Sequence, residues 1–152
     1  MADTYTQIFI HTIFVVKERL NIIPSDKKEK LFGYIGNIIK NKGNKLYIVN
    51  GMNDHVHALF GLNPNESLSS LIKEVKRMSS MYINKNSWVL GKFEWQAGYG
   101  AFSCSKSHTE RVFNYIKNQE QHHKKKSFKE EYIEILEKFG IEYENKYLFE
   151  DV

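Results

Sequence analysis

The sequence has few cysteines and prolines and no long apolar run. Its 152 residues include one cysteine and two prolines. A single cysteine excludes an internal disulfide framework and a zinc site built from several cysteines. No run of about 18 apolar residues occurs, so we expect no membrane-spanning helix. The N-terminal residues 1–4 lack the basic and apolar regions of a secretory signal, so we expect a soluble intracellular protein.

The composition favours one globular domain with a modest positive charge. Hydrophobic residues make up 41% and charged residues 26%, which at this length is enough for a buried core. The 22 Lys and Arg exceed the 18 Asp and Glu by four, and this surplus gives weak support for a polyanionic partner. No repeat, low-complexity segment or long linker divides the chain, so we expect residues 1–152 to form a single domain.

Residue patterns predict eight elements in the order β-α-β-β-α-β-α-α. Runs rich in β-branched and aromatic residues predict strands, and apolar residues three and four apart predict helices. The predicted strands cover residues 5–17, 45–50, 55–61 and 93–105, and the predicted helices begin at Pro24, Ser67, Ser107 and Ser127. The first six elements match an α+β fold, the ferredoxin-like βαββαβ sandwich with an antiparallel sheet. In that architecture the helices cover one sheet face and leave the other free for a partner.

Capping boxes and glycines mark the expected ends of the helices. Three pairs have the spacing at which the side chains cap the first backbone N–H groups of a helix. Gly43 and Gly140 are expected to end the first and the last helix, because glycine adopts the left-handed conformation found there. The third helix is expected to run to His122. The capping pairs are Asp26 and Glu29, Ser107 and Glu110, and Ser127 and Glu130.

The predicted strand at 55–61 carries two histidines separated by one residue. Because strand side chains alternate between faces, His55 and His57 point the same way, while Val56 points to the core. We therefore expect the two imidazoles side by side on an exposed or cleft face, where they can hold one divalent metal ion. The short pattern also suits two surface histidines, so spacing alone leaves both interpretations open. His11 and His108 lie outside the pattern and receive no role.

The predicted helix at 107–122 presents Tyr115 and Gln119 on one face, because residues four apart are neighbours on a helix. The Gln119 carbonyl oxygen suits a third metal ligand. Tyrosine can form covalent intermediates, but a free pKa of about 10 makes it a poor nucleophile without help. A divalent ion on a scissile phosphate supplies that help. With nine tyrosines in the chain, an ordinary helix-surface role for Tyr115 also stays open.

Basic side chains in two predicted helices provide positive charge that would attract the phosphates of a nucleic acid. One group lies beside the apolar stripe of the helix that begins at Ser67, and the other lies along the helix that carries Tyr115. Each could contact phosphates, and such contacts weaken as salt rises. Within the denser run at 122–126, we interpret residues 124–126 as mainly solvated surface. The candidate DNA-binding residues are Lys73, Lys76, Arg77, Lys106, Arg111 and Lys117.

These motifs together resemble a known family. His55-Val56-His57 resembles the His-hydrophobic-His motif of HUH endonucleases. Tyr115 followed by Gln119 resembles the nucleophile helix of the small single-tyrosine transposases of insertion sequence 200 type. The segment at 95–103 is similar to the strand that precedes that helix. The resemblance covers roughly residues 5–140 in the same order of elements.

The resemblance implies a DNA transposase that cleaves and rejoins single-stranded DNA. By this resemblance His55, His57 and Gln119 bind one Mg²⁺ or Mn²⁺, and Tyr115 attacks a phosphodiester to give a 5′-phosphotyrosine and a free 3′-hydroxyl. It also implies C-terminal helices of which one carries the tyrosine, a homodimer joined through its sheets, and hairpin-containing DNA. In the family, the tyrosine helix of one subunit can complete the metal site of the other. The same resemblance implies a bacterial or archaeal protein that lies in the cytoplasm, associates with the nucleoid and binds no membrane.

Two other functions stay open at this point. The same catalytic residues would serve a replication initiator, or a host-adopted nuclease that acts on repeat hairpins. A non-catalytic module for single-stranded nucleic acid belongs to a different class, and RRM domains use aromatic residues on an open ferredoxin-like sheet for that purpose. The middle strand here carries His55 and His57 instead, which favours the enzyme. Dependence on a metal ion would separate the two classes.

Overall fold

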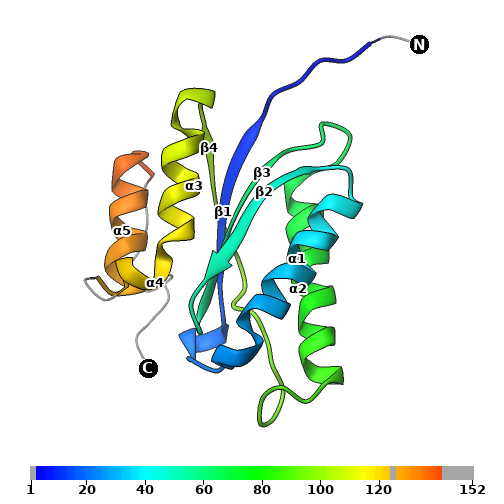
Figure 1. Ribbon diagram of the computed structural model, residues 1–152, viewed down its shortest axis with the longest axis vertical. Helices are drawn as coiled ribbons and strands as arrows, with labels where there is room; N and C mark the ends of the chain where they lie inside the picture. Colours follow the sequence, from blue (N-terminus) through cyan, green and yellow to red (C-terminus); the bar gives the residue numbers. More distant parts are fainter. Residues whose placement is uncertain (1–2, 124–125, 142–152) are drawn as a thin grey trace.

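A four-stranded antiparallel sheet lies between two groups of helices in the computed structural model, which describes residues 3–123 and 126–141 (Figure 1). The strand order β2-β3-β1-β4 is that of the ferredoxin-like sandwich and confirms the predicted fold class. The hairpin of β2 with β3 is confirmed too. The strands are β1 (Phe9–Val15), β2 (Lys45–Gly51), β3 (His55–Gly61) and β4 (Gly100–Cys104).

Helices cover both faces of the sheet. Figure 1 shows α1 and α2 on one side and α3, α4 and α5 on the other. The expectation that one face stays free for a partner is therefore wrong for this chain. None of the helices in the described ranges is long and apolar enough to cross a membrane. The helices are α1 (Lys28–Asn41), α2 (Leu68–Lys85), α3 (Thr109–Lys117), α4 (Gln119–His122) and α5 (Phe128–Lys138).

The central strand β1 explains why both faces are covered. All seven of its residues are buried, so it presents apolar side chains to each side. Phe14 packs into the core formed with α1 and α2. Ile13 and Val15, on the opposite face, pack against α5 in a second core. Leaving that second face in water would expose large apolar area at a cost of roughly 25 cal/mol per Å².

Two predicted strands are shorter than the sequence indicates. The strand expected at 5–17 is β1, and the one expected at 93–105 pairs continuously only over β4. In the part of the predicted range that precedes β4, Trp95 forms an isolated antiparallel bridge with Val16, and Gly98 adopts a φ of +87°. The strand-like composition of this stretch therefore reflects burial, since Phe93 and Trp95 are core residues that pack on α2 and β1 rather than members of a ladder.

Two of the three predicted capping boxes do not form. Short 3-10 turns at Ser25–Lys27 and Lys106–His108 precede α1 and α3, so the helices begin later than expected. Their N-cap residues are Lys27 and His108, and neither makes a side-chain cap. Ser127 does cap α5, where its hydroxyl accepts a hydrogen bond from the Glu130 backbone N–H at 3.2 Å. The 3-10 turns satisfy their own backbone groups and so remove the need for a box.

The helix expected over 107–122 is interrupted at Asn118, which separates α3 from α4. The Asn50 side chain of β2 causes this break, because its Nδ2 donates to the carbonyls of Ile116 and Lys117 at 2.9 and 3.1 Å. A side-chain donor on the last carbonyls of a helix replaces the bonds that further turns would make. The break fixes the position of Gln119 relative to the sheet.

Replacing Ser67 with alanine is expected to lower the free energy of unfolding by about 1 kcal/mol. The Ser67 hydroxyl caps α2 by accepting from the backbone N–H of Ser70 at 3.1 Å, as the sequence predicts. Urea denaturation measures the change. Ser70→Ala is the matched control, because it removes an exposed hydroxyl of the same helix without removing the cap. Equal stabilities for both variants would contradict the capping role.

Candidate metal and nucleophile site

The two histidines of β3 lie on one sheet face, as strand alternation predicts, with ring centroids 5.1 Å apart. The expected exposed or cleft position is wrong, because both His55 and His57 are completely buried. Gln119 of α4 and Phe128 of α5 cover them, and the Phe128 ring lies 4.3 Å from the His55 ring. The neutral imidazole is the form that binds metal ions.

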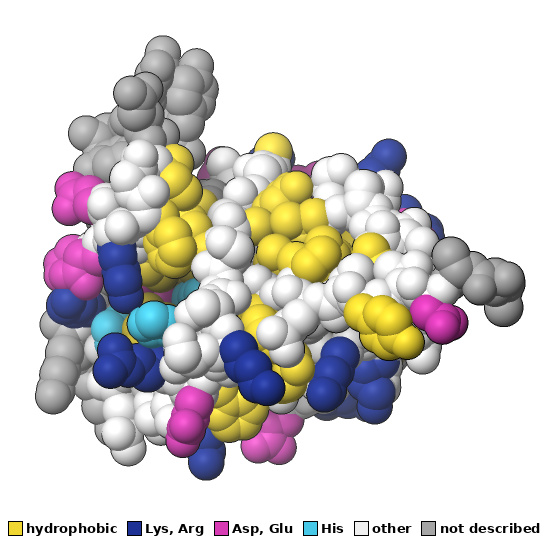
Figure 2. Space-filling view, turned by 90° about the horizontal axis from the view of Figure 1, so that it is seen from above, with side chains coloured by type: hydrophobic (Ala, Val, Ile, Leu, Met, Phe, Trp, Pro, Cys, Tyr) yellow, Lys and Arg dark blue, Asp and Glu magenta, His cyan; other side chains and the backbone are white. Residues whose placement is uncertain are grey.

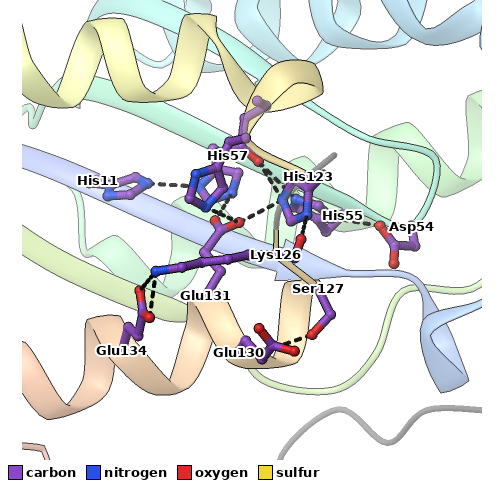
Figure 3. Close-up of polar contacts among 12 residues, drawn as sticks. His11, Asp54, His55, His57, His123, Lys126, Ser127, Glu130, Glu131 and Glu134 are labelled. Atoms are coloured by element: carbon purple, nitrogen blue, oxygen red, sulfur yellow. Dashed lines mark hydrogen bonds and ion pairs between the residues drawn. The ribbon is translucent and has the colours of Figure 1, made fainter.

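Each of these histidines is held by a contact at its Nδ1 atom. His55 Nδ1 lies 2.6 Å from a carboxylate oxygen of Asp54, and His57 Nδ1 lies 2.9 Å from Nε2 of His11 (Figure 3). Both Nε2 atoms are thereby left to face the other elements of the site. Metal-binding histidines in proteins are held in this way, with the second nitrogen fixed by a neighbouring group. His11 therefore positions His57, a role that its place in the sequence did not reveal.

Tyr115 and Gln119 reach the same cluster from α3 and α4. Gln119 is fully buried, and its Oε1 lies 3.1 Å from Nε2 of His55 and 3.0 Å from Nε2 of His123. The half-buried Tyr115 ring meets the His57 ring edge to face at 5.8 Å. The four residues singled out in the sequence analysis thus lie together within one chain.

The structure adds Glu131 of α5, which the sequence analysis did not select. Its carboxylate is almost fully buried and lies 2.9 Å from His57 Nε2, 2.6 Å from His123 Nε2 and 3.3 Å from His122 Nε2. The sequence holds one sign of it, because Glu131 stands three residues after Phe128 and four before Ile135 and so puts a charge on an apolar helix stripe. A charged residue at such a position is rarely buried without a partner.

The atoms of this cluster suit a divalent cation. One ligand atom each of His55, His57 and Glu131 lies within 4.8 Å of the others. His57 Nε2 and both carboxylate oxygens of Glu131 are buried and lack a hydrogen-bond partner of regular geometry among the described residues. Buried polar groups in native proteins normally have a partner. Two imidazole nitrogens, a carboxylate and the Gln119 amide oxygen form a donor set that fits Mg²⁺ or Mn²⁺.

Burial sets the protonation of His11 and His57. It lowers the pKa of His11 to about 3, with His57 nearby adding to the effect. It lowers the pKa of His57 to about 4, although Glu131 opposes the shift. Both imidazoles are therefore neutral near pH 7. For Glu131, burial would raise the pKa, but contacts with His123 and His57 outweigh it and hold the carboxyl ionised.

Tyr115 is protonated in this arrangement. Burial raises the pKa of its hydroxyl far above the ordinary value, and the negative charge of Glu131 raises it further. A hydrogen bond with Gln119 opposes the shift. Since a phenol attacks phosphorus well only as its proton leaves, positive charge beside the hydroxyl is what this site requires for nucleophilic chemistry.

A cavity of about 770 Å³ opens beside Tyr115, between β4, α3 and α5. His11 and Phe102 form part of its wall, and Arg111 and Lys138 also line it. Figure 2 shows histidine side chains in a hollow of the surface with Lys and Arg side chains around them. A mostly apolar cavity with cations at its edge suits a nucleotide, whose base is flat and apolar and whose phosphate is anionic.

The candidate DNA-binding residues lie on two different sides of the sheet. Lys73, Lys76 and Arg77 belong to α2, which lies across the sheet from α3, α4 and α5 (Figure 1). Lys76 donates to the backbone carbonyls of Gln96 and Gly98, and burial lowers its pKa to about 8. Arg77 pairs with Glu74 of its own helix. Lys106, Arg111 and Lys117 lie in or next to α3, on the side of Tyr115. DNA binding by these six residues stays a prediction.

The sheet has the ferredoxin-like strand order, with paired histidines on its central strand β3 and the tyrosine helix α3 beside them. Residues 4–119 match the family of IS200-like transposases, and the chain belongs to this family. It is 24% identical over 118 residues to the ISDra2 transposase TnpA of Deinococcus radiodurans, an alignment that spans 74% of this chain and 84% of that protein. The recognised family is thereby confirmed.

Two solved structures share the fold. A candidate transposase from Deinococcus radiodurans superposes with a TM-score of 0.58 at 22% identity, over 78% of this chain and 96% of that one. A REP-associated tyrosine transposase bound to a REP hairpin superposes with a TM-score of 0.61 at 13% identity, over 81% and 73%. The family match ends at residue 119, so α5 and Glu131 lie beyond it.

Proposed function

We propose that this transposase cleaves and rejoins single-stranded DNA through a covalent 5′-phosphotyrosine at Tyr115, with one Mg²⁺ or Mn²⁺ held by His55, His57 and Gln119. The observation that supports the proposal is that Gln119 contacts Nε2 of His55 while the Tyr115 ring meets the ring of His57, with both histidines buried. When bound, the ion polarises the scissile phosphate and stabilises the charge that develops on it.

The chain's own groups supply the remaining steps. His11 and Asp54 fix the two imidazoles, and the carbonyl oxygen of Gln119 faces Nε2 of His55. The Tyr115 Oη forms the bond to phosphorus as its proton leaves, the bond from phosphorus to the 3′ oxygen breaks, and that oxygen takes up a proton. One phosphoester replaces another, so a second 3′-hydroxyl can reverse the reaction without ATP.

Hairpin-containing single-stranded DNA is the proposed substrate. The REP-associated tyrosine transposase with the shared fold was solved bound to a REP hairpin, and this supports the choice. We further propose that residues 1–152 act as one domain, within a homodimer joined through its sheets, in the bacterial or archaeal cytoplasm at the nucleoid. A host-adopted nuclease acting on repeat hairpins would use the same chemistry.

A non-catalytic binding module fits the described residues less well. RRM-type recognition needs an open sheet face on which bases stack. Here α5 covers that face through contacts of Phe128 and Tyr132 with Ile13, Val15 and Phe102. Buried histidines that face a carboxylate serve no purpose in base stacking. The fold therefore supports the enzyme over the module.

The direct test is a covalent adduct between protein and DNA. A library of single-stranded oligonucleotides, labelled at either end, is incubated with the protein in Mn²⁺ or in EDTA and run on a denaturing protein gel. The proposal expects label to travel with the protein only in Mn²⁺ and only from the 3′ end, because a 5′-phosphotyrosine retains the downstream fragment. Binding without any adduct, across metals and sequences, would support the non-catalytic module.

Arg111→Ala is expected to weaken binding of single-stranded DNA more than Arg77→Ala. Arg111 lines the cavity beside Tyr115, whereas Arg77 lies across the sheet and is paired with Glu74. Loss of one phosphate contact should also reduce the slope of log K against log salt by about 0.7. Fluorescence anisotropy at several salt concentrations measures both quantities. A larger loss for Arg77→Ala would instead place the DNA on the face of α1 and α2.

A further inference from the structure

We propose that Glu131 of α5 is a fourth protein ligand of the divalent ion, so that the ion ties the C-terminal helix to the central strands of the sheet. The proposal rests on the proposed function, since it concerns the same ion. It extends that function to a helix beyond the match with the family, and it makes α5 part of the metal site rather than a cover for it.

Geometry is the first argument. The Glu131 carboxylate lies 2.9 Å from His57 Nε2, and ligand atoms of Glu131, His57 and His55 all lie within 4.8 Å of one another (Figure 3). Ligand atoms bound to one ion at about 2.0–2.3 Å are separated by distances of this order. Both oxygens of the carboxylate are buried and lack a hydrogen-bond partner of regular geometry among the described residues.

Charge is the second argument. Glu131 is almost fully buried, and no Lys or Arg in the described part of the chain forms an ion pair with it. The nearby Lys126 binds Glu134 instead, at 2.5 and 2.6 Å. An ionised carboxylate is costly to bury unless positive charge compensates it. A divalent ion among the histidines would compensate the charge of Glu131.

The third argument is that α5 packs tightly against the sheet, which fixes the position of Glu131. Phe128, Tyr132 and Leu136 form a buried cluster with strands β1 and β4. Gly100 of β4 lets this helix approach, since a Cβ there would lie 2.6 Å from the Tyr132 hydroxyl. The Ser127 cap fixes the first turn of α5, in which Glu131 stands. Glu131 therefore reaches the histidines from a packed helix.

The chemistry of the donors agrees with this role. Two imidazoles alone favour softer divalent ions over Mg²⁺ and Mn²⁺, which prefer oxygen. A carboxylate beside the Gln119 amide oxygen adds oxygen donors and negative charge. The same carboxylate contacts Tyr115, so displacement of Glu131 toward the ion would release the Tyr115 hydroxyl.

Titration of Mn²⁺ into the DNA-free protein tests the proposal. Isothermal calorimetry and the electron paramagnetic resonance signal of free Mn²⁺ both report the dissociation constant. Glu131→Gln, which keeps size and polarity, is expected to weaken Mn²⁺ binding by about tenfold or more. Glu130→Gln is the matched control, because it removes the same charge from an exposed position of the same helix, and it should bind like the wild type.

Hydrogen exchange on the wild-type protein supplies a second measurement that needs no variant. If Glu131 binds the ion, Mn²⁺ should slow amide exchange in α5 by more than in α1, which lies on the other side of the sheet. Equal Mn²⁺ affinities for Glu131→Gln and Glu130→Gln, or unchanged exchange in α5, would overturn the proposal. If a metal-dependent adduct still forms in that case, the proposed function survives. A wild-type protein that binds no Mn²⁺ would refute both.

Discussion

Tyr115→Phe is expected to abolish the covalent adduct with DNA while leaving binding of single-stranded DNA nearly unchanged. The substitution removes only the hydroxyl that forms the bond to phosphorus. The ring keeps its contacts with His11, His57 and His122, whose centroids lie 5.0 to 6.3 Å away, so the fold of α3 should be preserved. The denaturing gel measures the adduct, and anisotropy measures the binding.

The matched control is Tyr82→Phe. Tyr82 stacks on Tyr34 at 4.2 Å among the helices on the other side of the sheet, and a phenylalanine there retains the stacking. This variant should form the adduct at the wild-type rate. An adduct that persists in Tyr115→Phe would refute the assignment of the nucleophile and would direct the search to the other hydroxyls around the cavity.

His57→Ala should reduce metal-dependent cleavage by at least about a thousandfold, even in excess Mn²⁺. The expected factor follows because a metal ion contributes several kcal/mol to phosphoryl chemistry, and each 1.36 kcal/mol is a factor of ten in rate. The substitution removes one Nε2 donor and also leaves His11 and Glu131 without the imidazole that both now contact. Single-turnover cleavage of a labelled oligonucleotide measures the effect.

Val56→Ala is the control for the damage that any small residue causes in this strand. Val56 is fully buried next to His57 but points to the opposite core, among α1 and α2. We expect it to lower the melting temperature while cleavage below that temperature stays near the wild-type rate. If His57→Ala cleaves normally while still folded, the histidines do not hold the catalytic ion and the proposed mechanism fails.

The placement of Tyr115 and Gln119 relative to the sheet shows where sequence reasoning stops. Their spacing of four predicts a shared helix face, yet the structure divides them between α3 and α4. The break depends on Asn50, which is 66 residues away from Ile116 along the chain and caps its carbonyl. Nothing in the local pattern around Asn118 indicates that partner, because the contact exists only once β2 and α3 are packed together.

His11 and Glu131 are two residues of the site whose roles local sequence patterns do not reveal. Neither belongs to a motif with local spacing, so neither was selected as a candidate. His11 meets His57 because β1 and β3 pair in one register, and Glu131 meets it because α5 packs on that sheet face. The local sign of Glu131 in the sequence is its charge at helical spacing from Phe128 and Ile135.

The sequence by itself determined the order of the elements, the fold class, the facing pair His55 and His57, and the family. The first three depend on periods of 2 and 3.6 residues that backbone geometry imposes locally, whereas the family follows from the resemblance of the histidine and tyrosine motifs. The tertiary structure alone decided that both sheet faces are covered, that the histidines are buried, and that Glu131 joins them. Such contacts depend on the summed packing of residues far apart in sequence, and no local period encodes that sum.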